Sequence, residues 1–336
     1  LFRWFSAPVK YNYNYTRQDY INLIKSDSDN FNKYEAFQKF SQEIILWIII
    51  SWETKIDQSY IKLIWDILEN KEIDNSFKAE LMSLPSIKEI WNIIWENIDY
   101  EKIYKSLVYV EKIISKLYIS NFTNIYNDLY IEKEYDFNSK DIWNRKLKNI
   151  CLKYISLFDW PEIAYLQYKK SNNMTDMMWA LECLNDINCD QRKLAFEDFY
   201  NKYKDDNITI NKWFKLEATS FLPDTLENIK NITNLEVFDI KKPNNVYSLL
   251  RSFAWLNPVL FNKKDWSWYE YIMDKVLEID RFNPMVAWRI AKYLTNWKSL
   301  EKSSWKVLKK VLIKMSNYEE LSIWLKEVIN KSLSEG

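Results

Sequence analysis

The sequence predicts an all-α protein, an irregular HEAT- or armadillo-like superhelix of about fourteen helices. Apolar residues recur at helical spacing almost throughout, as Tyr60, Leu63, Ile64 and Ile67 do. Turn-forming residues divide this pattern into segments of helical length, and no convincing strand pattern follows Tyr15. Helices joined by short turns stack as pairs, and the lack of a strict internal repeat predicts irregular stacking.

The first fifteen residues differ from the rest of the chain. Residues 5–15 alternate apolar and polar side chains beyond Pro8, as a strand does. Because one strand is not stable alone, we expect its sheet partners upstream of residue 1. We therefore divide the chain into residues 1–15, the end of a sheet domain, and residues 16–336, the helical domain.

Turn-forming residues and capping signals mark the helix boundaries. Ser86 with Glu89 three residues later fits a capping box. Pro161 and Pro284 suit the first turn of a helix, where the missing N–H costs nothing. The expected breaks are 26–28, 70–74, 84–86, 138–140, 160–161, 172–173, 223–224, 243–245, 257–258, 283–284 and 316–317.

The composition is unusual in two residue types. The chain has 17 tryptophans and one glycine, the terminal Gly336, where about 7% glycine is ordinary. Because some bacterial lineages read the UGA codon as glycine, one hypothesis is that many of these tryptophans are glycines in the living cell. The alternative is a genuinely tryptophan-rich helical protein. The glycine hypothesis predicts that the turn tryptophans Trp266 and Trp268 are exposed or have a positive φ.

Charge and cysteine usage exclude several classes of partner. Lys+Arg and Asp+Glu are 47 each, so the net charge of zero disfavours nucleic acid and membrane surfaces. The longest apolar run, residues 44–50, is shorter than the roughly 20 residues of a spanning helix. Cys151, Cys183 and Cys189 lack metal or disulfide spacing, and no signal peptide is visible. We therefore expect a cytoplasmic protein without nucleic-acid or membrane partners.

The residues themselves offer little catalytic chemistry. The chain has no histidine, the commonest general base and zinc ligand. It has no phosphate-binding or dinucleotide motif, even when each tryptophan is read as glycine. We expect no catalytic and no metal-binding residue in this segment. Taken alone, the residues favour a scaffold or lid over a self-sufficient enzyme.

Five short motifs carry a family resemblance. They are LFRWFSAPV at 1–9, NNMTD at 172–176, KWFKLEATS at 212–220, SFAWLNP at 252–258 and RFNP at 281–284. In order and spacing they resemble the C-terminal helical domain of bacterial aminopeptidase N, in the alanyl aminopeptidase family of zinc metallopeptidases. The first motif looks like the last strand of the family's β-sandwich domain. Trp4 and Trp255 stand where the family has glycine, whereas Trp213 aligns with a family tryptophan. We interpret NNMTD as a turn or helix cap.

The resemblance implies a function for the longer protein. This segment would be the C-terminal domain of a zinc-dependent aminopeptidase that releases N-terminal amino acids from peptides. The zinc ligands and the residues that bind the substrate amine would lie upstream, so this segment would bind no zinc. The implied partners are the upstream catalytic domain of the same polypeptide and peptide substrates, and we expect a monomer. The helical domain would wall the active-site cavity and restrict substrate access. A free-standing helical-repeat interaction scaffold is the alternative.

The resemblance also suggests which residues face that cavity. The family pattern N-P-Q-V-A-x-R appears at 283–289 as NPMVAWR. Arg289 keeps the basic position and could pair with a peptide carboxylate; a structural ion pair is the alternative. Met285 replaces the usual glutamine and predicts a more apolar wall. The family's N-P-N-R segment appears at 242–245 as KPNN, with Asn245 in place of the arginine and Tyr247 two residues later, so both are cavity candidates without a basic contact.

Overall fold

The computed structural model describes residues 13–51, 53, 55–132, 134–158, 161–263 and 267–334. Within these ranges the chain forms helices joined by short connections, and the only β-type pairing there is an isolated parallel bridge between Ile98 and Leu300. The predicted all-α class is therefore confirmed. The predicted N-terminal strand falls mostly on residues 1–12, outside the described residues. Residues 13–16 have no regular secondary structure.

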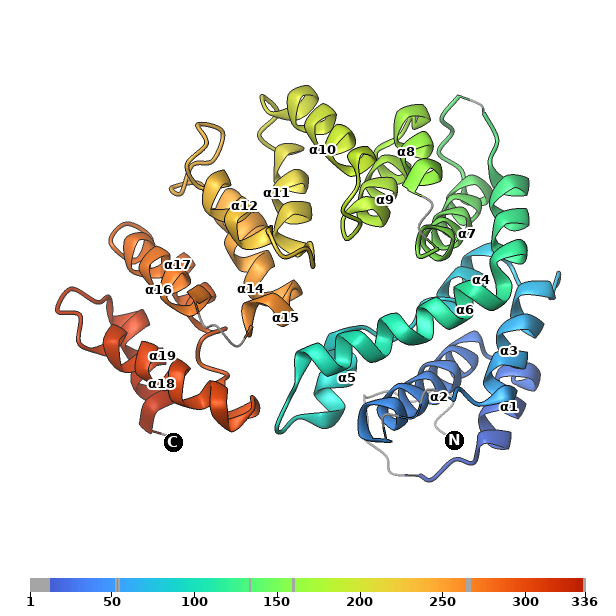
Figure 1. Cartoon of the computed structure of the whole chain (residues 1–336), viewed down its shortest axis with the longest axis horizontal. Helices are drawn as coiled ribbons and strands as arrows, with labels where there is room; N and C mark the ends of the chain where they lie inside the picture. The colour runs from blue at the N-terminus through green and yellow to red at the C-terminus, as the bar shows by residue number, and fades with distance from the viewer. Residues whose placement is uncertain are drawn as a thin grey trace.

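Helices α1 to α19 follow one another along the chain, with a π-helical segment, η1, and a 3-10 turn, η2 (Figure 1). They exceed the expected fourteen, and three of them, α13, α14 and α15, are only four or five residues long. None of the helices in the described part is both long and apolar enough to span a lipid bilayer. Their bounds are α1 Arg17–Ser26, α2 Asn30–Ser51, α3 Gln58–Glu69, α4 Asn75–Leu81, α5 Ile87–Ile94, α6 Tyr100–Leu129, α7 Ser139–Ser156, α8 Pro161–Lys170, α9 Met174–Leu184, α10 Asp190–Tyr203, α11 Ile210–Thr219, α12 Thr225–Ile232, α13 Pro243–Val246, η1 Tyr247–Arg251, α14 Ser252–Leu256, α15 Pro258–Phe261, α16 Ser267–Asp280, α17 Pro284–Ala291, η2 Trp297–Ser299, α18 Lys302–Ser316 and α19 Ile323–Ser334.

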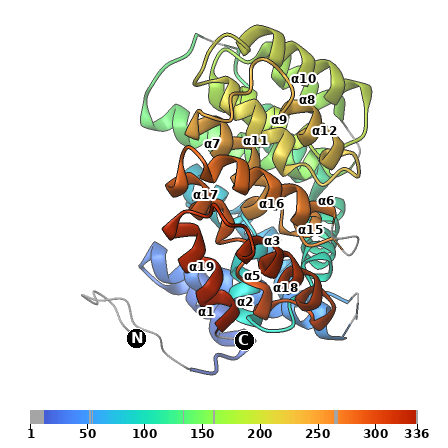
Figure 2. The same ribbon diagram turned by 90° about the vertical axis from the view of Figure 1, so that its left-hand side faces the viewer.

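The helices follow an arc that runs from α1 through α8 and α10 to α19 (Figure 1). Neighbours in sequence pack against each other, as α1 does with α2, α8 with α9, α16 with α17 and α18 with α19. In Figures 1 and 2 the first and last helices lie on the same side of the molecule, opposite α8 and α10. This is the predicted superhelix, in which each pair covers an apolar face of the next.

Capping explains several helix boundaries. The Ser86 hydroxyl accepts a hydrogen bond from the Glu89 N–H, and the Glu89 carboxylate accepts one from the Ser86 N–H, 2.7 Å away. The predicted capping box is therefore confirmed. Pro161 and Pro284 are the first residues of α8 and α17, as predicted. The sequence analysis missed the boundary at the end of α5, where Trp95 caps the helix in a left-handed conformation with φ 48°.

The tryptophans occupy contrasting places. Trp268 is 1% exposed and stacks on Phe253, with ring centroids 4.2 Å apart. The prediction that Trp268 is exposed or at positive φ is wrong, because its ring fills the core between α14 and α16. Trp266 lies outside the described residues. Trp95, in contrast, is 67% exposed and has one of the two positive φ values among the described non-glycine residues.

The 30-residue helix α6 brings distant parts of the arc together. It packs against α2, α3 and α5, and also against α7 and α15 (Figure 1). At its start, the Ile98 N–H donates to the Ser299 carbonyl, 3.0 Å away. Tyr104 stacks on Phe221, and Trp91 of α5 contacts Trp255 of α14, with ring centroids 4.2 Å and 6.0 Å apart. These three contacts, which we call the seam, join the α5–α6 region to the C-terminal half of the arc.

Candidate functional site

Two of the four predicted cavity residues meet. Tyr247 begins the π-helical segment η1, and Arg289 lies in the last turn of α17. The Arg289 guanidinium donates a hydrogen bond to the Tyr247 hydroxyl, 3.1 Å away, and lies 5.8 Å from the centre of its ring. Short π-helical segments frequently occur at functional sites. The structure therefore places Arg289 and Tyr247 in one cluster.

A second arginine, which the sequence analysis missed, completes this cluster. The Arg251 guanidinium lies 5.8 Å from the same Tyr247 ring and donates through Nε to the Tyr293 hydroxyl, 3.1 Å away. The four residues Arg251, Arg289, Tyr247 and Tyr293 form what we call the arginine–tyrosine cluster. Arg251 follows Tyr247 by four residues, a spacing that places both on one face of a helical segment, but no sequence motif marks Arg251.

Both arginines of the cluster carry an uncompensated charge. Arg251 and Arg289 are exposed, and no carboxylate in the described part of the chain lies within ion-pair distance of either guanidinium. The alternative of a structural ion pair for Arg289 is therefore not seen there. Each guanidinium has five N–H donors and uses one in the hydrogen bonds above. The cluster offers these remaining donors to an anion, and a carboxylate suits the planar guanidinium fork.

The other two predicted residues are neighbours of the cluster in sequence, since Met285 lies one turn before Arg289 on α17 and Asn245 lies two residues before Tyr247. Met285 is exposed on the first turn of α17. Asn245 is buried; its amide donates to Asn211 Oδ1 and accepts from the Asp239 N–H, both at 3.0 Å. Asn245 thus holds the segment before η1 in place, and its buried amide is not on the open surface.

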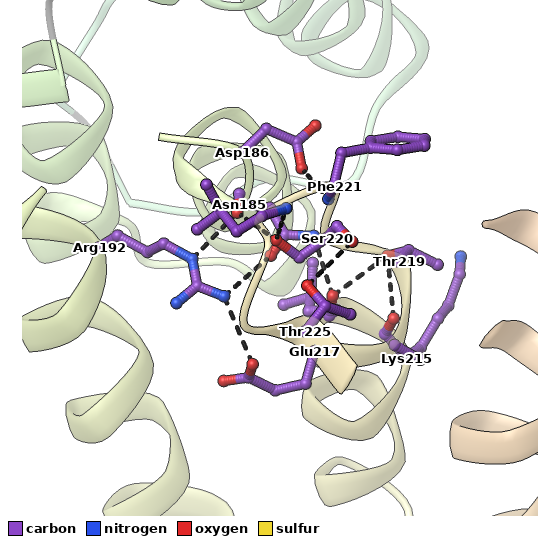
Figure 3. A network of polar contacts seen from close by, with 12 residues as sticks. Asn185, Asp186, Arg192, Lys215, Glu217, Thr219, Ser220, Phe221 and Thr225 are labelled. Carbon is purple, nitrogen blue, oxygen red and sulfur yellow. Dashed lines mark hydrogen bonds and ion pairs between the residues drawn. The ribbon is translucent and has the colours of Figure 1, made fainter. Parts of the chain in front are cut away.

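A second polar network supports the seam (Figure 3). Arg192 and Glu217 form a buried ion pair at 3.3 Å, and Arg192 Nε donates to the Asn185 carbonyl. The Asp186 carboxylate accepts from the Phe221 N–H at 2.8 Å, which fixes the residue whose ring stacks on Tyr104. Asp186 is exposed on one side, yet burial by the surrounding protein raises its pKa to about 6. Burial also raises the pKa of Glu217.

The NNMTD motif forms a helix cap, as predicted. The Asn173 side chain accepts from the Asp176 N–H at the start of α9. The Asp176 carboxylate is itself buried and accepts from Lys148 Nζ at 2.7 Å and from Asn149 Nδ2 at 2.8 Å. The motif therefore ties the start of α9 to α7.

The residues that the structure describes do not form a zinc site. The whole chain lacks histidine, and the described residues hold no cluster of three or more cysteine, aspartate or glutamate side chains with metal-binding geometry. Zinc in proteins takes three or four such ligands.

Comparison with known proteins agrees with the fold. Residues 17–334 match the family described as a domain of unknown function (DUF3458_C) with ARM repeats. The chain is 26% identical over 337 residues to aminopeptidase N of Escherichia coli strain K12, covering 98% of the chain and 38% of the relative. It is 27% identical over 334 residues to aminopeptidase N of Haemophilus influenzae, again covering 98% of the chain and 38% of the relative.

A solved structure is similar along almost the whole chain. It is that of Legionella pneumophila aminopeptidase A in complex with aspartic acid, with a TM-score of 0.89 and 26% identity over 98% of this chain and 40% of that one. The resemblance to bacterial aminopeptidase N is therefore confirmed, and the chain spans about two fifths of the length of these relatives. From the all-helical arc and the match over residues 17–334, we conclude that the chain belongs to the DUF3458_C family of ARM-repeat domains.

Proposed function

We propose that the chain is the C-terminal domain of a zinc-dependent aminopeptidase that releases N-terminal amino acids from peptides. The observation that carries this proposal is the similarity to aminopeptidases along 98% of the chain in both sequence and fold. The free-standing scaffold has no observation of its own in its favour. In this proposal the partners are an upstream catalytic domain of the same polypeptide and peptide substrates.

The role of this domain would be to wall the active-site cavity. The arc and its seam give the wall a fixed shape, which would admit peptide ends and exclude folded proteins. When bound, zinc would supply an activated water, but its ligands would lie outside this chain, whose described residues form no zinc site. The residues of this chain would bind and orient the peptide and limit water in the cavity.

Within the wall, the arginine–tyrosine cluster is the proposed peptide contact. Arg289 and Arg251 would hold a substrate carboxylate, with Tyr247 between them as a flat apolar surface. Met285 would contribute an apolar contact nearby. Asn245 would act only by holding η1 in place.

We further propose that the protein acts as a monomer in the cytoplasm. All three cysteines are unpaired in the structure, as a reducing compartment favours. Burial raises the pKa of Cys151 and Cys183 to about 12 each, so both stay as inert thiols at neutral pH.

The test is activity of the full-length gene product. We expect it to hydrolyse an aminoacyl p-nitroanilide and short peptides, to lose activity with a metal chelator and to leave folded proteins intact. With Arg289→Gln, kcat/KM for a tripeptide should fall about tenfold, while its C-terminal amide and the anilide, which lack the carboxylate, should be cleaved as before. A reading frame with no upstream peptidase domain, or a product without peptidase activity, would overturn the proposal.

We also propose that some of the tryptophans are glycines encoded by UGA. The support is Trp95, an exposed left-handed helix cap where glycine is the favoured residue. Trp268 counts against recoding at its own position, because it fills a core pocket. We expect UGA at the codons of Trp95, Trp4 and Trp255 and UGG at that of Trp213; UGG at all four would refute the idea. The arginine–tyrosine cluster contains no tryptophan, but Tyr293 packs on Trp255, with ring centroids 5.2 Å apart, so glycine at that position would remove this contact and the Trp91 contact of the seam.

A further inference from the structure

A cavity of about 300 Å³ lies away from the arginine–tyrosine cluster, where α7, α8 and α9 meet the end of α6 (Figure 1). Its volume equals about ten water molecules at roughly 30 Å³ each, enough for a small organic molecule. Its charged lining residues are Lys148 and Asp176 on its inner side, and Lys170 and Glu132 at the surface. Tyr130, at the end of α6, also lines it.

Lys148 supplies unused hydrogen-bond donors to this cavity. Its side chain is 8% exposed, and its ammonium has three N–H donors. In the described part of the chain its one hydrogen-bond acceptor is the Asp176 carboxylate, at 2.7 Å. Its other near neighbour is the ring of Tyr130, whose centre is 5.5 Å from Nζ. Buried donors without partners are costly, so an acceptor group in the cavity would satisfy them.

The side-chain amides next to Lys148 already hydrogen-bond to other protein groups. Gln167 donates to Asn149 Oδ1 and to the Asp176 carbonyl, and accepts from the Tyr126 hydroxyl. Asn149 in turn donates to Asp176. In contrast, no described residue hydrogen-bonds the Tyr130 hydroxyl. The cavity therefore offers donors from Lys148, at its inner end, and from the half-buried Tyr130, whose ring lies beside Lys148 Nζ.

The outer end of the cavity carries a carboxylate that is paired with a lysine. Glu132 pairs there with Lys170 at 2.6 Å, and both are largely exposed. The helices α6 and α8 both end there, and helix C-termini carry partial negative charge. The ionised side chains that line the cavity, Lys148, Lys170, Asp176 and Glu132, sum to zero charge. A ligand with one charge of each sign would match both ends without adding net charge.

We propose that this cavity binds a free α-amino acid as a zwitterion. The carboxylate would accept from Lys148 at the inner end and from Tyr130 beside it, and the ammonium would lie near Glu132 and the C-termini of α6 and α8 at the outer end. The site is separate from the proposed peptide contact. This inference rests on the proposed function. In an aminopeptidase the released product is also a free amino acid, so occupancy of this site would rise with the concentration of product.

The first experiment compares ligands by calorimetry with the full-length protein. L-leucine should bind, whereas L-leucine methyl ester, which lacks the carboxylate, and N-acetyl-L-leucine, which lacks the ammonium, should each bind at least about tenfold more weakly. Inorganic phosphate should not compete. Absence of leucine binding would overturn the proposal, and equal binding of N-acetyl-L-leucine or competition by phosphate would replace it with a simple anion site.

Variants locate the binding in this cavity. Glu132→Gln should weaken leucine binding about fivefold, because it removes the carboxylate that faces the ligand's ammonium, whereas Lys170→Gln should strengthen binding, because it frees that carboxylate from its lysine partner. Lys169→Gln is the matched control, because Lys169 precedes Lys170 in the sequence but does not line the cavity. Lys148→Met should abolish leucine binding. If the Lys148→Met protein does not fold, Tyr130→Phe tests the same donors, because it removes only a hydroxyl and should also weaken leucine binding. Equal affinities for Lys169→Gln and Lys170→Gln would overturn the site. Peptidase activity is measured separately, so its absence would refute only the proposed function.

Discussion

Two buried ion pairs of almost equal exposure serve different ends in this domain. Lys148 and Asp176 are 8% and 9% exposed, and Arg192 and Glu217 are 9% and 8% exposed. Arg192 donates hydrogen bonds to two protein acceptors, the Asn185 carbonyl and Glu217. Its guanidinium also lies over the ring of Phe196. Lys148 has one protein acceptor and a cavity beside it. Burial alone therefore does not distinguish a structural charge from one available to a ligand; the cavity beside Lys148 does.

The largest loss of stability should come from breaking the Arg192–Glu217 pair. Arg192→Leu leaves Glu217 buried without its partner, so the free energy of unfolding should fall by about 3–5 kcal/mol. Denaturant unfolding measures this loss. Lys193→Leu, at the exposed next position, is the control and should change stability by less than about 0.5 kcal/mol. A loss below about 1 kcal/mol for Arg192→Leu would mean that the pair is not structural.

Breaking the pair beside the cavity should cost less. Lys148→Met should lower the free energy of unfolding by about 2–3 kcal/mol, because Asp176 keeps its bonds from Asn149 and Asn173 and water can enter the cavity. The double variant with Asp176→Asn should recover part of this loss. A cost equal to that of Arg192→Leu would remove the distinction between the two pairs.

The polar network beside the Arg192–Glu217 pair should also make the stability of the protein depend on pH. The folded-state pKa of Asp186, about 6, exceeds the roughly 3.9 of a free aspartate. Its contribution to stability is therefore complete below about pH 4 and is lost as the pH rises through 6. Thermal unfolding between pH 4 and pH 7 should show a flatter profile for Asp186→Asn than for the unmodified protein.

Asp206 provides a control of opposite sign. Hydrogen bonds from the Ile208 and Thr209 backbone lower its pKa, so its contribution is present at neutral pH and is lost as the pH falls. Asp206→Asn should therefore remove stability at neutral pH rather than flatten the profile near pH 6. Identical profiles for the two variants would contradict this assignment.

The smallest effect on stability should come from the exposed arginines. Arg251→Gln and Arg289→Gln should each change the free energy of unfolding by less than about 0.5 kcal/mol, because neither pairs with a carboxylate in the described residues. Denaturant unfolding again measures this. A loss comparable to that of Lys148→Met would give these residues a structural role instead of the proposed peptide contact.

Local signals in the sequence predicted local structure well. The capping pair Ser86 and Glu89, the first-turn prolines of α8 and α17 and the cap at Asn173 all appear as expected. Each depends on residues within a few positions, whose geometry the helix itself fixes. The all-helical class follows from the same short-range periodicity.

The pairings between helices were not predictable in this way. Lys148 and Asp176 are 28 residues apart, and Arg192 and Glu217 are 25 apart. Apolar periodicity shows which face of a helix is buried but not which helix covers it. The same limit explains why Trp268 was expected in a turn and lies in the core, and why Arg251 was missed beside Arg289.

The seam changes the mechanics expected of a helical array. An open stack of repeats resembles a spring, in which each unit touches only its neighbours and the ends can spread at little cost. A contact such as that of Ile98 with Ser299, about 200 positions apart in the sequence, links distant repeats directly and closes the array into a loop. Widening the array would require breaking the contacts of the seam. A few contacts remote from any reacting bond would therefore set the largest peptide that the proposed enzyme could admit.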